Sequence, residues 1–208
     1  MDLQCLLWLR PSCLSSPMLV FVLCCINRPS GSCRLTVSLA AGILLAWSPP
    51  LTGVVVHVSR YSISASLDGL WPNGPVLVTV IYGPCVGALH DQLWAELHHV
   101  RQLAASPWLL AGDFNCLLSP TDSSSPIASG PSMSTFRSFV DEFGLFDMPL
   151  DNEPPILRRL DRVFLSPELF SAFPSSSLVL GPRHLSDHAP LFLSLLRGRA
   201  GTGRQVPF

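Results

Sequence analysis

The chain contains no lysine, and charged residues of any kind are scarce. Its 13 basic residues are all arginine, and only 13% of its 208 residues are charged. Because the net charge is −1, the chain lacks the overall cationic field that draws many proteins to nucleic acid. Any binding of phosphate groups would depend on individual arginines, whose planar guanidinium can make two parallel hydrogen bonds to a phosphate.

Long apolar runs are also absent. The run from Met18 to Ile26 is about nine residues long, which is far too short to span a bilayer. Asp2 has the wrong charge for the start of a signal peptide, and no small-residue cleavage site follows the apolar run. We therefore expect no stable membrane association and no secretion, and we expect a nuclear or cytoplasmic location.

The cysteines exclude a typical zinc site. There are seven, an odd number, and none forms a C-x-x-C pair. Five of them lie in the first 33 residues, a region without histidine. Free thiols in a reducing compartment are the simpler interpretation. The 20 prolines in turn argue against long uninterrupted helices.

Composition divides the chain into three regions. Residues 1–38 are rich in proline, serine and cysteine and show poor periodicity, so we expect an atypical segment that is weakly folded or disordered. Residues 39–197 have the strand and helix patterns of one domain. Residues 198–208 are rich in glycine and arginine, and we expect a disordered tail.

Within the domain, short apolar runs predict strands, and apolar residues at spacings of three and four predict two helices. We expect strands over 42–47, 53–59, 62–67, 75–82, 108–113, 159–165 and 177–180 and from Leu191 onward, and helices over 89–104 and 133–143. The first helix has Leu89, Leu93, Leu97, Val100 and Leu103 on one face, which leaves His90, His98 and His99 for the solvent. This order predicts a layered α/β sandwich.

Two short motifs stand at the polar ends of apolar runs. Gly112-Asp113-Phe114-Asn115 follows one predicted strand, and Ser186-Asp187-His188 precedes another. Together they bring two carboxylates, an amide and an imidazole to what could be one sheet edge. That set suits metal-assisted attack of water on a phosphate ester. Either motif alone has a plainer interpretation, because Asp and Asn commonly form turns after strands.

The order of four motifs resembles the endonuclease/exonuclease/phosphatase superfamily, and most closely the endonuclease domain of plant non-LTR (LINE-type) retrotransposons. The motifs are Val80-Ile81-Tyr82-Gly83-Pro84, Leu110-Ala111-Gly112-Asp113-Phe114-Asn115, Arg159-Leu160-Asp161-Arg162 and Leu185-Ser186-Asp187-His188. The resemblance implies a four-layered α/β/β/α sandwich, truncated here at its N-terminus. It also implies Mg²⁺- or Mn²⁺-dependent hydrolysis of phosphodiesters or phosphomonoesters, with DNA as substrate and a monomeric protein.

The resemblance assigns roles to three residues of the later motifs. His188 matches the histidine that acts as general base or as a direct phosphate ligand. Asp161 matches the carboxylate that orients this imidazole, and Asp187 matches a carboxylate of the metal site. For Asp161, an alternative is a surface carboxylate paired with Arg159 or Arg162.

The earlier motifs supply the other three candidates. Asp113 matches the residue that positions the water or protonates the leaving oxygen. Asn115 matches a donor to the scissile phosphate, and the hydroxyl of Tyr82 would reach the same phosphate. A tyrosine that only packs at a strand end is the alternative for Tyr82.

The chain also departs from the family pattern. Family members carry a glutamate at the end of their second strand as the principal Mg²⁺ ligand, but nothing between Asp2 and Asp68 is acidic here. The segment 150–157 is short and broken by prolines, where relatives have a longer aromatic strand. Metal binding would therefore be weakened. Two alternatives stay open, a catalytically inactive remnant or binding module and a phosphomonoesterase.

Four arginines are candidates for phosphate contacts: Arg158, Arg159, Arg162 and Arg183. Surface salt bridges are the alternative for each of them. Asp147 follows the second predicted helix, and we expect it to be structural rather than a metal ligand.

Overall fold

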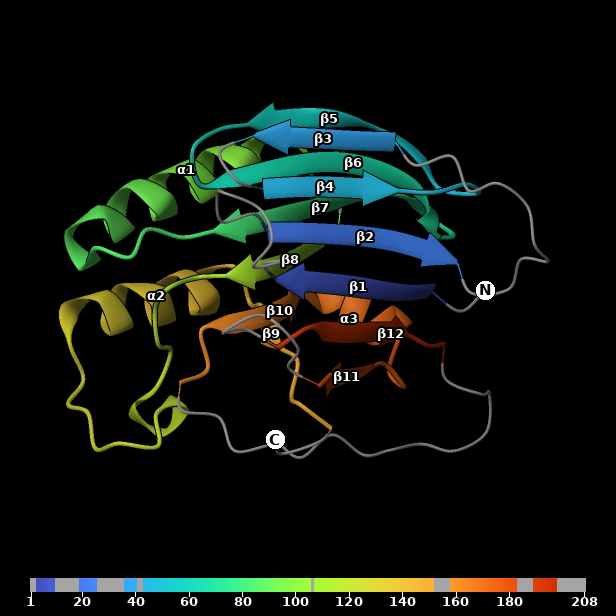
Figure 1. Cartoon of the computed structure of the whole chain (residues 1–208). Helices are drawn as coiled ribbons and strands as arrows, with labels where there is room; N and C mark the ends of the chain where they lie inside the picture. Colours follow the sequence, from blue (N-terminus) through green and yellow to red (C-terminus); the bar gives the residue numbers. More distant parts are fainter. Residues whose placement is uncertain are drawn as a thin grey trace.

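Two six-stranded sheets form the body of the protein (Figure 1). The computed structural model describes residues 3–9, 19–25, 36–40, 43–105, 107–151, 158–182 and 189–197. Sheet A, in the order β11-β12-β1-β2-β4-β3, contains β1 (Leu3–Leu9), β2 (Leu19–Cys25), β3 (Thr36–Ala40), β4 (Ile43–Trp47), β11 (Ser177–Leu180) and β12 (Leu191–Leu195). Sheet B, in the order β5-β6-β7-β8-β10-β9, contains β5 (Thr52–Val58), β6 (Ser62–Trp71), β7 (Gly74–Tyr82), β8 (Trp108–Asp113), β9 (Phe146–Asp147) and β10 (Asp161–Leu165).

The helices add a layer to sheet B. They are α1 (His90–Leu103), α2 (Pro131–Glu142) and the short α3 (Pro167–Ala172), with 3₁₀ turns η1 (Gly87–Leu89) and η2 (Pro120–Asp122). Side chains of α1 and α2 pack with one face of sheet B, where the rings of Trp94 and Phe136 lie 4.9 Å apart. α3 packs instead into the core between the sheets, through Leu169. The described residues thus account for the α/β/β part of the expected four-layered sandwich.

Strands β7 and β8 run parallel at the centre of sheet B and are joined through α1. Since one face of them meets sheet A and the other meets the helices, both faces are buried, which explains the continuous apolar run of β8. All six residues of β8 are buried, including Asp113 at its end. No helix within the described ranges is long and apolar enough to cross a membrane.

Most expected elements are confirmed within one or two residues, and so is the α/β class. The expected antiparallel pair of residues 53–59 and 62–67 is the β5–β6 pair. The segment 1–38 contains β1 and β2, which occupy the middle of sheet A, with β2 parallel to β4. The expected tail 198–208 lies outside the described residues.

The first helix corrects two expectations. His90 is buried, with only 3% of its surface exposed, because its ring stacks on Trp94 and its Nδ1 bonds the carbonyl oxygen of Gly87 at 3.1 Å. Leu103, expected on the apolar face, is 44% exposed because it forms the last residue of the helix, beyond the sheet contact. His98 is partly exposed and His99 is exposed, as expected.

Candidate active site

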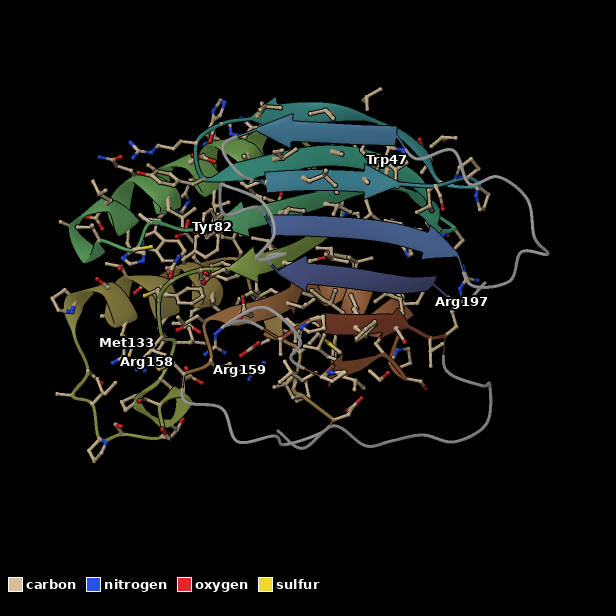
Figure 2. The ribbon with its side chains drawn as sticks, viewed as in Figure 1. Trp47, Tyr82, Met133, Arg158, Arg159 and Arg197 are labelled. Atoms are coloured by element: carbon tan, nitrogen blue, oxygen red, sulfur yellow. The ribbon has the colours of Figure 1, made fainter. Side chains whose placement is uncertain are left out.

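Three strand ends bring polar side chains to one edge of sheet B. Tyr82, the last residue of β7, is the register partner of Asp113, the last residue of β8. On the other side, Asp113 is the register partner of Asp161, the first residue of β10. Neighbouring strands lie about 4.8 Å apart, so the three residues stand in one row across three adjacent strands. Figure 2 shows Tyr82 at this end of the sheet.

The turn after β8 adds Asn115 to the row. The backbone N–H of Asn115 donates to Oδ1 of Asp113 at 2.8 Å, and its side-chain Nδ2 donates to the carbonyl oxygen of Gly83 at 2.8 Å. The backbone of Asn115 is left-handed, with φ at 49°, a conformation that asparagine tolerates better than most residues. An amide has two N–H donors, and Nδ2 uses one of them among the described residues, so its second hydrogen can serve a ligand.

Backbone contacts explain why glycines flank this row. Gly112 has φ at +145°, and a Cβ there would lie 2.0 Å from the carbonyl oxygen of Ile81 on β7. A Cβ on Gly83 would lie 2.3 Å from the carbonyl oxygen of Phe114. Only glycine permits this close approach of the two strand ends. Gly83, which belongs to the first of the four motifs but was given no role there, is therefore part of the site.

Phe114 anchors the turn in the core behind the row. It is fully buried, and its ring stacks 4.9 Å from that of Phe136 on α2 and meets Phe164 edge-on at 5.4 Å. Its backbone N–H donates to the carbonyl oxygen of Leu160 at 3.1 Å. Phe114 therefore fixes Asp113 and Asn115 on the opposite, polar side of the chain.

Two of the six candidate residues, Asp187 and His188, lie outside the described residues. The other four are together: Tyr82, Asp113, Asn115 and Asp161. Asp113 is almost fully buried, with 2% of its surface exposed, and the other three are half-buried. Within the described ranges, no group of three or more His, Cys, Asp or Glu side chains is arranged to hold a metal ion. The two carboxylates of the row do not make a metal site by themselves.

A buried ion-pair network lies on the far side of β10. Arg162, with 1% of its surface exposed, bonds Oδ2 of Asp147 through Nη1 and Oδ2 of Asp122 through Nη2. Arg159 bonds Oδ1 of Asp147 at 2.9 Å. The same Asp122 oxygen accepts the backbone N–H of Ser119 at 2.6 Å. The network ties the loop after Asn115 to β9 and β10.

Burial shapes the ionisation of this network. It raises the pKa of the Asp147 carboxyl and lowers the pKa of the Arg159 guanidinium, because both charges are taken out of water. The charges of Arg162 and Arg159 act against the first shift, and the charge of Asp147 acts against the second. Of the two roles open for Arg159 and Arg162, the network favours ion pairing over phosphate contacts, and it agrees with the expected structural role of Asp147.

Two cysteines differ sharply in their surroundings. Cys116 is buried next to the site, and burial raises the pKa of its thiol to about 11, against a smaller opposing effect of the Arg162 charge. Cys85 is a free thiol that is exposed. At pH 8 the Cys116 thiol, with its pKa of about 11, is ionised in about one molecule in a thousand, and the thiolate is the reactive form.

We therefore expect iodoacetamide to modify Cys116 at least about 100-fold more slowly than Cys85 at pH 8. Peptide mapping by mass spectrometry at increasing times measures both rates in the same sample. In urea, where the fold is lost, the two rates should converge. Equal rates in the native protein would show that Cys116 is accessible and would contradict its place in the core.

Residues 15–188 match the Endonuclease/Exonuclease/phosphatase family. No curated protein matches the chain in sequence. Among solved structures, the endonuclease domain of TRAS1, a telomere-specific non-LTR retrotransposon, is 14% identical with a TM-score of 0.59, over 79% of this chain and 79% of that one. AP endonuclease LMAP from Leishmania major is 15% identical with a TM-score of 0.48, over 67% of this chain and 56% of that one. Truncated TDP2 from Caenorhabditis elegans is 12% identical with a TM-score of 0.43, over 79% of this chain and 76% of that one.

The family match extends over most of the chain and agrees with the fold. It begins at residue 15, so it includes β2, which precedes the domain start that we expected at residue 39. The similarity to the TRAS1 domain confirms the fold independently of the sequence motifs. The chain therefore belongs to the endonuclease/exonuclease/phosphatase family.

Proposed function

We propose that this chain is a Mg²⁺-dependent endonuclease that hydrolyses phosphodiester bonds in DNA, of the type found in LINE-type retrotransposons. Members of the family hydrolyse phosphodiester or phosphomonoester bonds and generally use divalent metal ions. The observation that carries the proposal is the register of Tyr82, Asp113 and Asp161, which aligns three strand ends beside Asn115. Similarity to a retrotransposon endonuclease domain supports DNA as the substrate.

Each residue of the row has a task that its position suits. The buried carboxylate of Asp113 would position the attacking water or give a proton to the leaving oxygen. The second amide hydrogen of Asn115 and the hydroxyl of Tyr82 would donate to phosphate oxygens, where negative charge grows in the transition state. Because these donors are held by backbone bonds and strand register, little reorganisation is needed during the reaction.

The remaining tasks fall to Asp161 and to the two candidates outside the described residues, Asp187 and His188. We propose that His188 takes the proton from water and that Asp161 fixes the tautomer and angle of its imidazole, as second partners of catalytic histidines do. We propose Asp187 as the carboxylate for Mg²⁺ or Mn²⁺. A bound metal would stabilise charge on the phosphate.

The choice between DNA and a small phosphomonoester is tested with a panel of substrates. In Mg²⁺ we expect the purified chain to nick supercoiled plasmid DNA and to lose this activity in EDTA. We expect p-nitrophenyl phosphate to be hydrolysed at least about 100-fold more slowly, since it lacks the flanking strand whose binding energy would help to stabilise the transition state. Faster release from the monoester would favour a phosphomonoesterase.

The two tyrosines of the chain provide a matched pair of variants. Tyr82→Phe should lower the nicking rate about 10-fold, the effect of one lost hydrogen bond in the transition state. Tyr61→Phe removes a hydroxyl that bonds Oε1 of Gln92 at 3.3 Å on α1, and it should leave the rate unchanged. Equal effects of the two variants would place the reaction away from the row.

A further inference from the structure

A groove is formed by η2 and the first part of the loop that leads from it to α2. Its volume is about 500 Å³. The lining residues are Pro120, Thr121, Ser123, Ser124, Ser125, Pro126, Ile127 and Ala128. Half of them carry a hydroxyl, and none carries a charge. Hydroxyl and backbone N–H groups are common partners of phosphate and sugar oxygens in complexes with nucleic acid.

The groove is connected to the site through the segment before β10. The carbonyl oxygen of Leu160 accepts a hydrogen bond from the N–H of Phe114 at 3.1 Å. The N–H of Arg159 donates to the carbonyl oxygen of Asp122 at 2.9 Å. One step earlier, Arg158 forms an isolated β-bridge with Ser123, which lines the groove. Arg158 precedes Asp161 by three residues, so their Cα atoms are separated by about 10 Å or less.

The charges around the groove favour an anion. Asp122, the one carboxylate of the loop, is engaged by Arg162 in the buried network. Arg159 is engaged by Asp147. Arg158 is exposed and has no ion pair with any residue of the described ranges. Helix α2 starts at Pro131, shortly after the groove, and has no acidic residue in its first turn.

We propose that Arg158 and the groove over residues 120–128 bind the sugar–phosphate backbone of the nucleic acid next to the phosphate that is cleaved. This inference rests on the proposed function, because it places the groove along the path of the same substrate. Of the three candidate arginines in the described residues, Arg158 is the one that the network does not engage, so its guanidinium can reach a phosphate. The serine hydroxyls supply neutral donors that do not depend on base sequence.

Binding measured without catalysis tests the proposal separately from the reaction. Fluorescence anisotropy with a labelled DNA duplex, in EDTA and at several NaCl concentrations, gives the affinity and its salt dependence. Arg158→Ala should weaken binding about 5- to 10-fold and reduce the slope of log K against log salt by about 0.9, the effect of one lost phosphate contact. Arg197→Ala is the matched control, because Arg197 is also exposed and lies on the opposite side of the view in Figure 2.

A second pair of variants tests the groove itself. Ser125 is exposed, and Ser125→Glu places a negative charge in the groove, whereas Ser125→Gln adds similar bulk without charge. We expect the glutamate to weaken DNA binding about 5-fold or more and the glutamine to change it less than about 2-fold.

The outcomes separate the two proposals. Equal affinities and salt slopes for Arg158→Ala and Arg197→Ala, or no DNA binding by the natural chain, would overturn the groove proposal. If the natural chain nicks plasmid DNA while these variants bind alike, only the groove proposal fails. If binding depends on Arg158 but no nicking occurs, the groove proposal stands and the proposed endonuclease activity fails.

Discussion

Replacing Asp113 by asparagine is expected to lower the rate of DNA nicking about 100- to 1,000-fold with little loss of stability. Asparagine keeps the Oδ1 that accepts the backbone N–H of Asn115, so the turn after β8 should persist. What it removes is the charge and the proton-transfer capacity of a carboxylate that is almost fully buried at the edge of the sheet. A single group of this kind commonly contributes two to four orders of magnitude in rate.

The control for this variant is Asp68→Asn. Asp68 is exposed and pairs with Thr52, toward the end of β6 opposite Ser62 and the site. Gel assays of plasmid nicking in Mg²⁺ give the rates, and urea unfolding shows whether both proteins remain folded. We expect Asp68→Asn to nick at the natural rate. Full activity of folded Asp113→Asn would exclude Asp113 from the reaction.

Replacing Arg162 by methionine is expected to lower the free energy of unfolding by about 3–5 kcal/mol. The guanidinium is buried between Asp147 and Asp122, and removing it leaves two carboxylates near the core without their main partner. Asp147 keeps Arg159, and Asp122 keeps the N–H groups of Leu118 and Ser119. These bonds limit the loss without replacing the missing charge.

Urea unfolding at pH 7 measures this loss, and Arg158→Met is the matched control. It makes the same substitution four residues away, at an exposed position with no ion pair among the described residues. We expect the control to change the free energy of unfolding by less than about 0.5 kcal/mol. A similarly small effect of Arg162→Met would mean that the network does not hold the loop and β9 to β10.

The row of site residues is well predicted by sequence because it depends on local patterns. Each apolar run marks a strand, and the polar residue that ends the run must stand at a sheet edge. The resemblance assigned Tyr82 and Asp113 to one site, and the register of β7, β8 and β10 aligns both residues with Asp161. Asn115 follows from the same turn, since its left-handed backbone continues directly from β8.

The ion-pair network had no such local pattern. Asp122 stands alone among serines and prolines, and Arg162 follows Asp161 at the polar start of its strand, so neither residue lies in a pattern that predicts burial or pairing. Their pairing joins positions 40 residues apart and depends on how the loop folds back over β10. The capping of η2 by Ser119 positions Asp122 for its contact with Arg162, and the composition of the loop does not reveal this contact.

Burial at the ends of α1 was also hidden from the sequence. The periodicity assigned a polar face to His90 and an apolar face to Leu103, as if the helix were covered along its whole length. At the start of the helix, however, His90 stacks on Trp94 and is buried. At its end, Leu103 is the last residue of the helix and is exposed. Tertiary neighbours therefore decide exposure at the ends of a helix more than its periodicity does.

The most direct test of one shared hydrolytic site is a double-mutant cycle on plasmid nicking in Mg²⁺. It compares the natural chain with Asp113→Asn, His188→Ala and the combined variant. Groups that act in the same step are strongly non-additive. We predict that each single variant loses most of the activity and that the double variant is slower than the worse single variant by less than about 10-fold. If the losses of the two single variants multiply in the combined variant, the two residues act independently, and one shared site is contradicted. The absence of Mg²⁺-dependent nicking by the natural chain would contradict it as well.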